Sequence, residues 1–236
     1  MKHANIVVRY AFLCWVLVLG ENVMAIEEPQ FRVEFQKEHY EVRSYDPIIV
    51  AETVVKTDFD EAGNRAFRIL ADYIFGNNEV KVVAPKGPQT EENSPEPISS
   101  KKIPMTAPVL SSEKVSATTP SPVSQKIAMT APVSQVPSSD GFRVQFTMPK
   151  EFTLDTLPKP KDPRVEIKQL PARRIAVFSY SGSWSKERYE EKLSEFKSYL
   201  AADGVQVVGE PIFARFDSPF RLWFLRRNEI WLEVKK

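Results

Sequence analysis

The side chains that could act as nucleophile, base or metal ligand are few and scattered in this sequence. It contains one cysteine, Cys14, and two histidines, His3 and His39. There is no His-Glu-x-x-His, no Cys-x-x-Cys and no glycine-rich phosphate loop followed by Lys-Ser or Lys-Thr. A Ser-His-Asp arrangement would have to use His39 alone. We therefore expect a protein that binds without catalysis.

The first 25 residues have the pattern of an export signal. Lys2 and Arg9 precede an apolar block over residues 11–19, and the sequence Val-Met-Ala at 23–25 resembles a signal-peptidase site. We expect cleavage after residue 25 and export to the periplasm. The alternative is a segment kept as an inner-membrane anchor. Because the apolar block is much shorter than the roughly 20 residues that cross a bilayer, cleavage is favoured, with no stable membrane span afterwards.

The chain that remains after cleavage is near neutral. Residues 26–236 carry 30 basic and 30 acidic side chains. A protein that binds nucleic acid usually has a basic excess, so we expect no such partner. Cys14 leaves with the signal, which excludes a disulfide. The length and the 42% hydrophobic content fit a single domain over 26–236.

An octapeptide repeat interrupts the middle of the chain. Lys102-Ile-Pro-Met-Thr-Ala-Pro-Val109 returns, with one change, as Lys126-Ile-Ala-Met-Thr-Ala-Pro-Val133. The flanking sequence is rich in Pro, Ser, Thr, Lys and Glu, and we predict mobile surface insertions at about 85–101 and 111–125. The proline in each copy removes a backbone donor and suits an edge or bulged strand. The repeat is therefore interpreted as architectural, with ligand binding as the alternative.

Strand and helix patterns predict an α+β fold. Apolar residues alternate with polar ones over 31–36 and again over 142–148, which gives two strands with one apolar face each. Residues 40–51 and a following helix are echoed by residues 165–178 and a second helix. We therefore predict two pseudo-symmetric halves in the order strand, strand, helix, strand.

The two predicted helices differ in their apolar surface. The first should begin after an N-cap at Asp58, with Glu61 completing a capping box, and stop at Gly76; the second should run from Ser185 to Gly204. The second helix has one narrow apolar stripe. The first has two, formed by Phe59, Ala62, Ala66, Ile69 and Tyr73 and by Phe67, Leu70 and Ile74. One stripe covers a sheet, and the other needs a further partner.

A candidate partner is the aromatic segment at 213–231. The sequence Asp-Ser-Pro at 217–219 is a turn signal, and large apolar side chains surround it on both sides. We expect such a turn to avoid water, either as a buried corner or as the wall of a pocket.

Several of these elements resemble the SOUL haem-binding family. They are Tyr40-Glu-Val-Arg43, the Met-Thr-Ala-Pro-Val elements at 105–109 and 129–133, the strand ending Phe146-Thr-Met-Pro149, and Arg226-Arg-Asn-Glu-Ile-Trp231. The resemblance covers residues 31–234. It implies a distorted antiparallel β-barrel with two main helices, which binds haem or another porphyrin non-covalently against the first helix and the loop before the last strand.

The resemblance also implies which residues form the site. The pocket wall would consist of Phe67, Leu70, Ile74, Phe216, Pro219, Phe220 and Trp223, and the ligand carboxylates would pair with Arg65, Arg68, Arg221 and Arg226. Apolar walls with arginine at one edge suit the flat face and the two propionates of a porphyrin. The alternatives are a solvated helix face, with Glu61–Arg65 and Arg68–Asp72 pairs, and a closed mini-core at 220–225.

The expected iron ligand is missing from the matching position. Some family members that this chain resembles have a histidine directly after Tyr-Glu-[Val/Ile]-Arg, where this chain has Ser44. His39 is the remaining histidine after cleavage, and a surface role for it is favoured over axial ligation. We therefore expect iron held weakly or not at all by the protein.

Three functions remain open from the sequence. The favoured one is a tetrapyrrole carrier, buffer or sensor. The others are a binding module for different flat amphipathic molecules, as in the effector-binding domains that this barrel also resembles, and a protein-interaction module that uses the surface at 220–225. The sequence identifies no protein partner.

Overall fold

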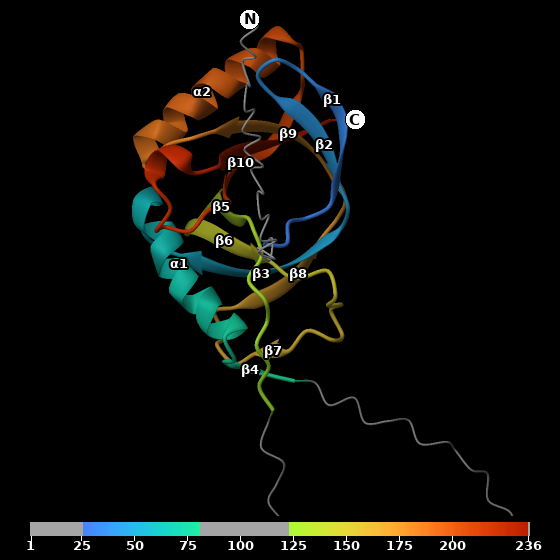
Figure 1. The fold of residues 1–236 in the computed structure, drawn as a ribbon, viewed down its shortest axis with the longest axis vertical. Coiled ribbons are helices and arrows are strands. Elements are labelled where there is room, and N and C mark those ends of the chain that lie inside the picture. The colour runs from blue at the N-terminus through green and yellow to red at the C-terminus, as the bar shows by residue number, and fades with distance from the viewer. Residues whose placement is uncertain (1–25, 81–122, 236) are drawn as a thin grey trace, which may run out of the picture.

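The computed structural model describes residues 26–80 and 123–235, which form a large curled sheet with two helices on its outer side and a small two-stranded sheet of β4 and β7 (Figure 1). The predicted signal at 1–25, the insertion at 85–101 and the first octapeptide copy lie outside the described residues, as does most of the insertion at 111–125. The elements are β1 (Phe31–Gln36), β2 (Glu41–Tyr45), β3 (Ile48–Val55), α1 (Phe59–Ile74), β4 (Asn78–Glu79), β5 (Val133–Ser138), β6 (Gly141–Thr147), β7 (Lys159–Pro160), β8 (Glu166–Leu170), β9 (Arg173–Tyr180), α2 (Lys186–Ala202), β10 (Val207–Arg215), the 3₁₀ turn η1 (Trp223–Leu225) and β11 (Asn228–Val234).

Nine strands make the main sheet in the order β1-β2-β9-β11-β10-β5-β6-β3-β8, and each neighbouring pair is antiparallel. β1 and β8 are the two edges, so the curled sheet is a half-barrel. This confirms the predicted α+β class with two main helices. Strand, strand, helix occurs twice, as β2-β3-α1 and as β8-β9-α2; the symmetry of the two halves stays a prediction.

Local sequence signals set the ends of both helices. The Asp58 side chain accepts a hydrogen bond from the backbone N–H of Glu61 at 2.9 Å, and Ser185 caps α2 in the same way through Arg188. After α1 the chain turns through Gly76, whose φ of 127° lies in the region that glycine tolerates best. The predicted starts and stops are therefore confirmed. The capping box expected from Glu61 is not completed, because its carboxylate accepts from the Thr57 hydroxyl and pairs with Arg65 instead of the Asp58 N–H.

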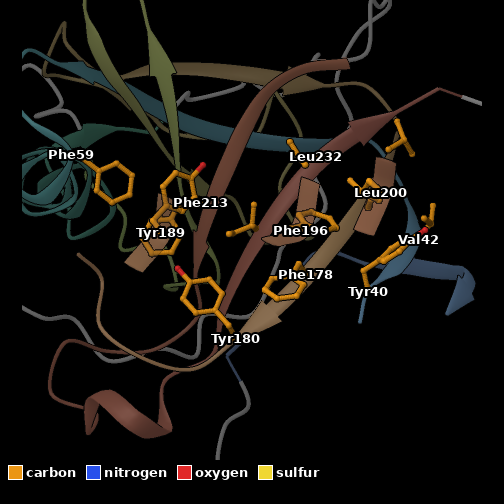
Figure 2. Packing of buried hydrophobic residues seen from close by; sticks show 13 residues of the cluster. Tyr40, Val42, Phe59, Phe178, Tyr180, Tyr189, Phe196, Leu200, Phe213 and Leu232 are labelled. Atoms are coloured by element: carbon orange, nitrogen blue, oxygen red, sulfur yellow. The ribbon is translucent and has the colours of Figure 1, made fainter. Parts of the chain in front are cut away.

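The outer face of the sheet holds an aromatic core beneath both helices (Figure 2). Phe59, at the start of α1, stacks on Tyr189 of α2 with ring centroids 4.9 Å apart and on Phe213 of β10 at 5.5 Å. Phe196 of α2 stacks on Phe178 of β9 at 5.4 Å. Such pairs add to the free energy gained by burying the rings, so this cluster ties α1, α2 and the sheet together.

The inner face of the sheet carries a buried charge network. The guanidinium of Arg43 on β2 lies 3.0 Å from the carboxylate of Glu229 on β11, which also accepts from Trp231 Nε1 at 2.6 Å and pairs with Arg227 at 2.8 Å. Burial lowers the pKa of Arg43, but the Glu229 carboxylate and the Tyr45 hydroxyl together outweigh burial and keep that pKa above its ordinary value. These residues come from the two sequence elements that carried the family resemblance.

The prediction of a second free stripe on α1 is wrong for two of its three members. Leu70 and Ile74 are completely buried against the outer face of the sheet, together with Ala66 and Tyr73. Ile127 and Leu157, which lie outside the strands, belong to the same buried cluster, so α1 is covered over a wider arc than the sheet alone would cover. Of that stripe, only Phe67 stays partly exposed. Within 26–80 and 123–235, neither helix is long and apolar enough to cross a membrane.

Candidate functional site

A groove of about 660 Å³ opens on the outer side of the sheet, between the first half of α1 and the turn that follows β10. Its volume lies in the range of small-molecule pockets, roughly 300–1,000 Å³. The groove is lined by Glu61, Asn64, Arg65, Phe67, Arg68, Val133, Trp184, Arg215, Asp217 and Pro219. Its walls therefore come from five parts of the chain: α1, β5, β10, the segment before α2 and the turn after β10.

Arg215, the last residue of β10, is the most unusual group in the groove. It is only 8% exposed, and no carboxylate of the described residues lies within ion-pair distance of it. One Nη donates to the side-chain oxygen of Gln135 at 3.1 Å, while Nε has no hydrogen-bond partner. Taking a charge out of water without a counter-charge costs free energy. An anion bound beside this guanidinium would offset that cost.

The helix makes room for this guanidinium at a glycine. A Cβ at position 63 of α1 would collide with Nη1 of Arg215. Burial lowers the pKa of Arg215 to about 10, and nearby Tyr180 and Asp60 oppose that shift. The side chain therefore stays positively charged at neutral pH despite its burial.

Aromatic rings form the walls on either side. Phe67 packs on Phe146 of β6 with ring centroids 5.4 Å apart. Trp184 is fixed by a hydrogen bond from its Nε1 to Asn228 at 2.7 Å. The guanidinium of Arg226 lies 4.3 Å from the centroid of the Trp184 ring, and that of Arg215 lies 5.1 Å from it. A flat apolar molecule would meet two rings already held in place.

Two further guanidiniums without carboxylate partners lie near the groove. Arg68 and Arg226 take part in no ion pair within the part of the chain that the structure describes. Arg65, by contrast, pairs with Glu61 at 2.6 Å. Of the two helix pairs expected for a solvated face, Glu61–Arg65 is thus formed, and Arg68–Asp72 is not. The groove and the residues beside it therefore carry a net positive charge.

Comparison with known proteins gives the family. The model of a family described as SOUL heme-binding protein matches residues 26–233. The chain belongs to this family. A human relative, "Heme-binding protein 2", is 28% identical over 199 residues, which cover 83% of this chain and 78% of the relative. Membership confirms the resemblance that the sequence showed and makes a haem-type ligand the first candidate for the groove.

Among solved structures, the C-terminal domain of EcmrR has a similar fold. It superposes with a TM-score of 0.51 and 11% sequence identity, covering 84% of this chain and 98% of that one. At this identity the likeness concerns the fold alone. The SOUL half-barrel of this chain is thus also found outside proteins of similar sequence.

Four of the residues expected from the SOUL resemblance meet in the groove: Arg65, Phe67, Arg68 and Pro219. The others lie elsewhere. Leu70 and Ile74 are in the core, and Phe216 packs on Trp231, with centroids 6.3 Å apart, on the inner face of the sheet. Arg226 does not line the groove but contacts two residues that do, since it lies over the ring of Trp184 and donates to the carbonyl oxygen of Pro219.

The aromatic turn does not form the expected wall or mini-core. Phe220 is 95% exposed and Trp223 is 60% exposed, and neither lines the groove. Arg221 pairs with Asp217 at 2.8 Å instead of facing the groove. The expectation that this turn avoids water is therefore wrong. Its large apolar side chains face solvent, and hydrogen bonds within the turn hold its shape.

Two important groove residues, Trp184 and Arg215, were missed in the sequence. Arg215 follows Phe213 by two residues on β10, so the two share the outer face of the sheet. The signal that could have identified it is an arginine at a strand position whose side chain points to the apolar face of the sheet. Trp184 directly precedes the α2 cap, where a tryptophan has an ordinary packing role, and it carried no such signal.

His39 lies far from the groove. Its ring stacks on Tyr199 near the end of α2, with centroids 4.3 Å apart, whereas Trp184 lies before the start of that helix. At 1.5 Å per residue these two ends are roughly 20 Å apart. Ser44, at the position of the expected histidine, hydrogen-bonds to Glu34. Among the residues that the structure places, no three His, Cys, Asp or Glu side chains gather as a metal site.

A second hollow, of about 390 Å³, lies at one end of the half-barrel. Its lining includes three carboxylates, from Glu27, Glu28 and Asp46, and one lysine, Lys150. It is smaller than the groove and offers an anionic ligand a less favourable charge. The groove beside Arg215 is therefore the better candidate for a SOUL-type ligand.

Proposed function

We propose that the protein binds haem or another tetrapyrrole non-covalently in the groove, as a carrier, buffer or sensor without catalysis. One observation carries the proposal: a buried guanidinium without a carboxylate partner, Arg215, lies in a groove with aromatic walls. A tetrapyrrole with propionates supplies what this groove lacks, namely a flat apolar body and an anion.

The residues present fit such a ligand. Phe67 and Trp184 would contact the macrocycle, because fixed rings gain most from a flat partner. One propionate would pair with Arg215, where a charge-assisted hydrogen bond in a dry setting is strongest. The second would reach Arg68, at the rim on α1. Apolar contact would supply affinity, and the guanidiniums would set orientation.

Iron, if the ligand carries it, would receive no histidine from the described residues, because His39 lies at the far end of α2. The proposed site recognises the macrocycle and its carboxylates more than the metal. Protoporphyrin without iron should therefore bind about as tightly as haem.

The test is a titration of the protein with haem and with protoporphyrin, followed by the Soret band. Micromolar protein should shift the band, and the dimethyl ester of protoporphyrin should bind at least tenfold more weakly, since a buried charged hydrogen bond contributes about 1.5–3 kcal/mol. In Arg215→Met, the difference between acid and ester should fall to that of the exposed Arg68 contact, about fivefold or less. A Soret band identical to that of free haem at micromolar protein would reject the proposal.

Two phenylalanine variants distinguish binding in the groove from nonspecific binding to exposed aromatic rings. Phe67→Ala removes a wall of the groove, whereas Phe75→Ala removes a ring of equal size that is 57% exposed at the end of α1. The first change should weaken porphyrin binding about tenfold or more, the second less than twofold. Equal losses would mean that the ligand binds outside the groove.

We also propose export, with removal of residues 1–25 and the domain formed by 26–236. Support comes from the basic start, the short apolar block and the Val-Met-Ala sequence at 23–25. N-terminal sequencing of protein purified from the cell envelope should begin at Ile26. A chain that begins at Met1 and stays with the membrane would favour the anchor instead.

A further inference from the structure

The segment between β10 and β11 projects a cluster of large apolar side chains into solvent. We call residues 216–227 the aromatic loop. Its exposed members are Phe220, Leu222, Trp223, Phe224 and Leu225, each more than half exposed. Proteins rarely leave such a contiguous patch in water unless it contacts a partner or a membrane.

The loop is held in this shape by its polar groups. Arg226 donates to the carbonyl oxygens of Pro219 at 2.7 Å and Arg221 at 2.9 Å. Asp217 accepts from the backbone N–H of Arg227 and pairs with Arg221 at 2.8 Å. Hydrogen-bonding groups therefore turn toward the inside of the loop, and the apolar side chains are fixed on the outside.

The charge around the loop is positive. Asp217 is the only acidic residue of the aromatic loop, and it is already engaged by Arg221. Arg226 within the loop and Arg68 on the neighbouring rim of the groove have no carboxylate partner among the residues that the structure places. An anionic surface would compensate both.

We propose that the aromatic loop docks the protein on an anionic lipid bilayer by inserting its apolar side chains. A projecting knob with a tryptophan, bordered by arginines, suits the interface between headgroups and acyl chains, where amphipathic rings and cations both gain. A cleft on a protein partner would have to enclose the knob on all sides. Docking would bring the groove to the membrane surface, because Pro219 belongs to both. The proposal stands without the tetrapyrrole.

The first test reads insertion at the loop itself. In the Cys14→Ser chain, Phe220→Cys is labelled with an environment-sensitive dye, and Phe75→Cys, also exposed but at the end of α1, is the matched control. Vesicles rich in phosphatidylglycerol should shift the emission of the loop dye to the blue and leave the control unchanged. Equal behaviour of the two dyes, or no shift at the loop, would overturn the proposal, whether or not another segment binds lipid.

The second test separates apolar and ionic contributions by co-sedimentation with vesicles. The double change Leu222→Ser and Phe224→Ser should weaken binding more than tenfold. Vesicles of phosphatidylcholine alone, or high salt, should weaken it at least fivefold, since each arginine near an anionic surface contributes about that factor. Unchanged sedimentation in the double variant would contradict insertion.

The same double variant distinguishes this proposal from the ligand site. Leu222 and Phe224 do not line the groove, so porphyrin titration should match that of the parent chain. Loss of porphyrin affinity with intact vesicle binding would make the loop a wall of the ligand site and overturn the membrane role. Failure of porphyrin binding in the parent chain would leave the vesicle result standing.

Discussion

At the scale of single residues, the site depends on how Arg215 is accommodated. A buried guanidinium with an unpaired Nε is unfavourable in the free protein, and it lies there only because Gly63 leaves α1 open at that point. The partner that we propose for it is a ligand carboxylate. Affinity should therefore respond to changes at position 63 although that residue offers no side chain to the ligand.

Gly63→Ala tests this dependence. Alanine favours the helix by about 1 kcal/mol over glycine, so the chain should still fold, but the added methyl displaces the Arg215 guanidinium. We expect at least fivefold weaker porphyrin binding by fluorescence titration. In the Arg215→Met background the same change should cost nothing more. An equal loss in both backgrounds would show that Gly63 acts through helix packing instead.

A histidine change tests iron ligation. His39 stacks on Tyr199 near the end of α2, roughly 20 Å from Trp184. His39→Ala should therefore leave the Soret position and the haem affinity within twofold of the parent values. A loss of the Soret shift in this variant, with protoporphyrin binding intact, would make His39 the axial ligand.

At the scale of elements, two of the sequence elements that carry the family resemblance meet on the inner face of the sheet, opposite the proposed ligand groove. The Tyr-Glu-Val-Arg element on β2 and the Arg-Arg-Asn-Glu-Ile-Trp element on β11 meet on the inner face through Arg43, Glu229 and Trp231. They hold together strands that are separated by β9. We interpret this inner-face contact as structural. The Met-Thr-Ala-Pro-Val element, by contrast, ends at Val133, which lines the groove.

Glu229→Ala tests that interpretation. The carboxylate is fully buried, and its loss leaves the Trp231 N–H without its acceptor and removes one of the two carboxylate partners of Arg43, which keeps Glu41. We expect the free energy of unfolding, measured by urea denaturation, to fall by about 3–5 kcal/mol. Porphyrin affinity of the folded fraction should stay within twofold. A stable variant that loses porphyrin would place the ligand on the inner face.

The helix ends, and the apolar face of each of the two predicted strands, could be predicted because they follow from patterns and contacts within a few residues, such as the Asp58 cap. Which side of α1 remains open could not, because Leu70 and Ile74 are covered by strands, and by residues between strands such as Ile127 and Leu157, that are distant in sequence. The basic and aromatic residues of α1 were assigned to the site, but Arg215 was missed for the same reason. Its environment depends on Gly63 and Trp184, which no local pattern connects to it.

At the scale of the whole molecule, the curled sheet divides the chain into an aromatic outer core and a charged inner face. The outer core includes Tyr180 and Tyr189, and a separate part beneath α1 includes Tyr73; Tyr45 lies on the inner face. All four tyrosines are at most 9% exposed. Their phenols therefore make stability depend on alkaline pH.

Burial raises the pKa of Tyr45 to about 12, and it raises those of Tyr73, Tyr180 and Tyr189 even further above the ordinary value. An unfolded chain ionises these phenols near pH 10, whereas the folded chain keeps their protons. Stability should thus be complete below about pH 9 and fall as the pH rises through 10 toward 12. At pH 11 each phenol should cost about 1.4 kcal/mol.

Urea denaturation between pH 8 and pH 11 measures this decline, and Tyr180→Phe is its control. The Tyr180 hydroxyl has no hydrogen-bond partner among the residues that the structure describes, so its removal leaves no group unpaired. That variant should be at least as stable as the parent at pH 8 and should lose about 1.4 kcal/mol less by pH 11. Parallel curves for the two proteins would mean that Tyr180 already ionises in the folded state, which its burial beneath α2 opposes.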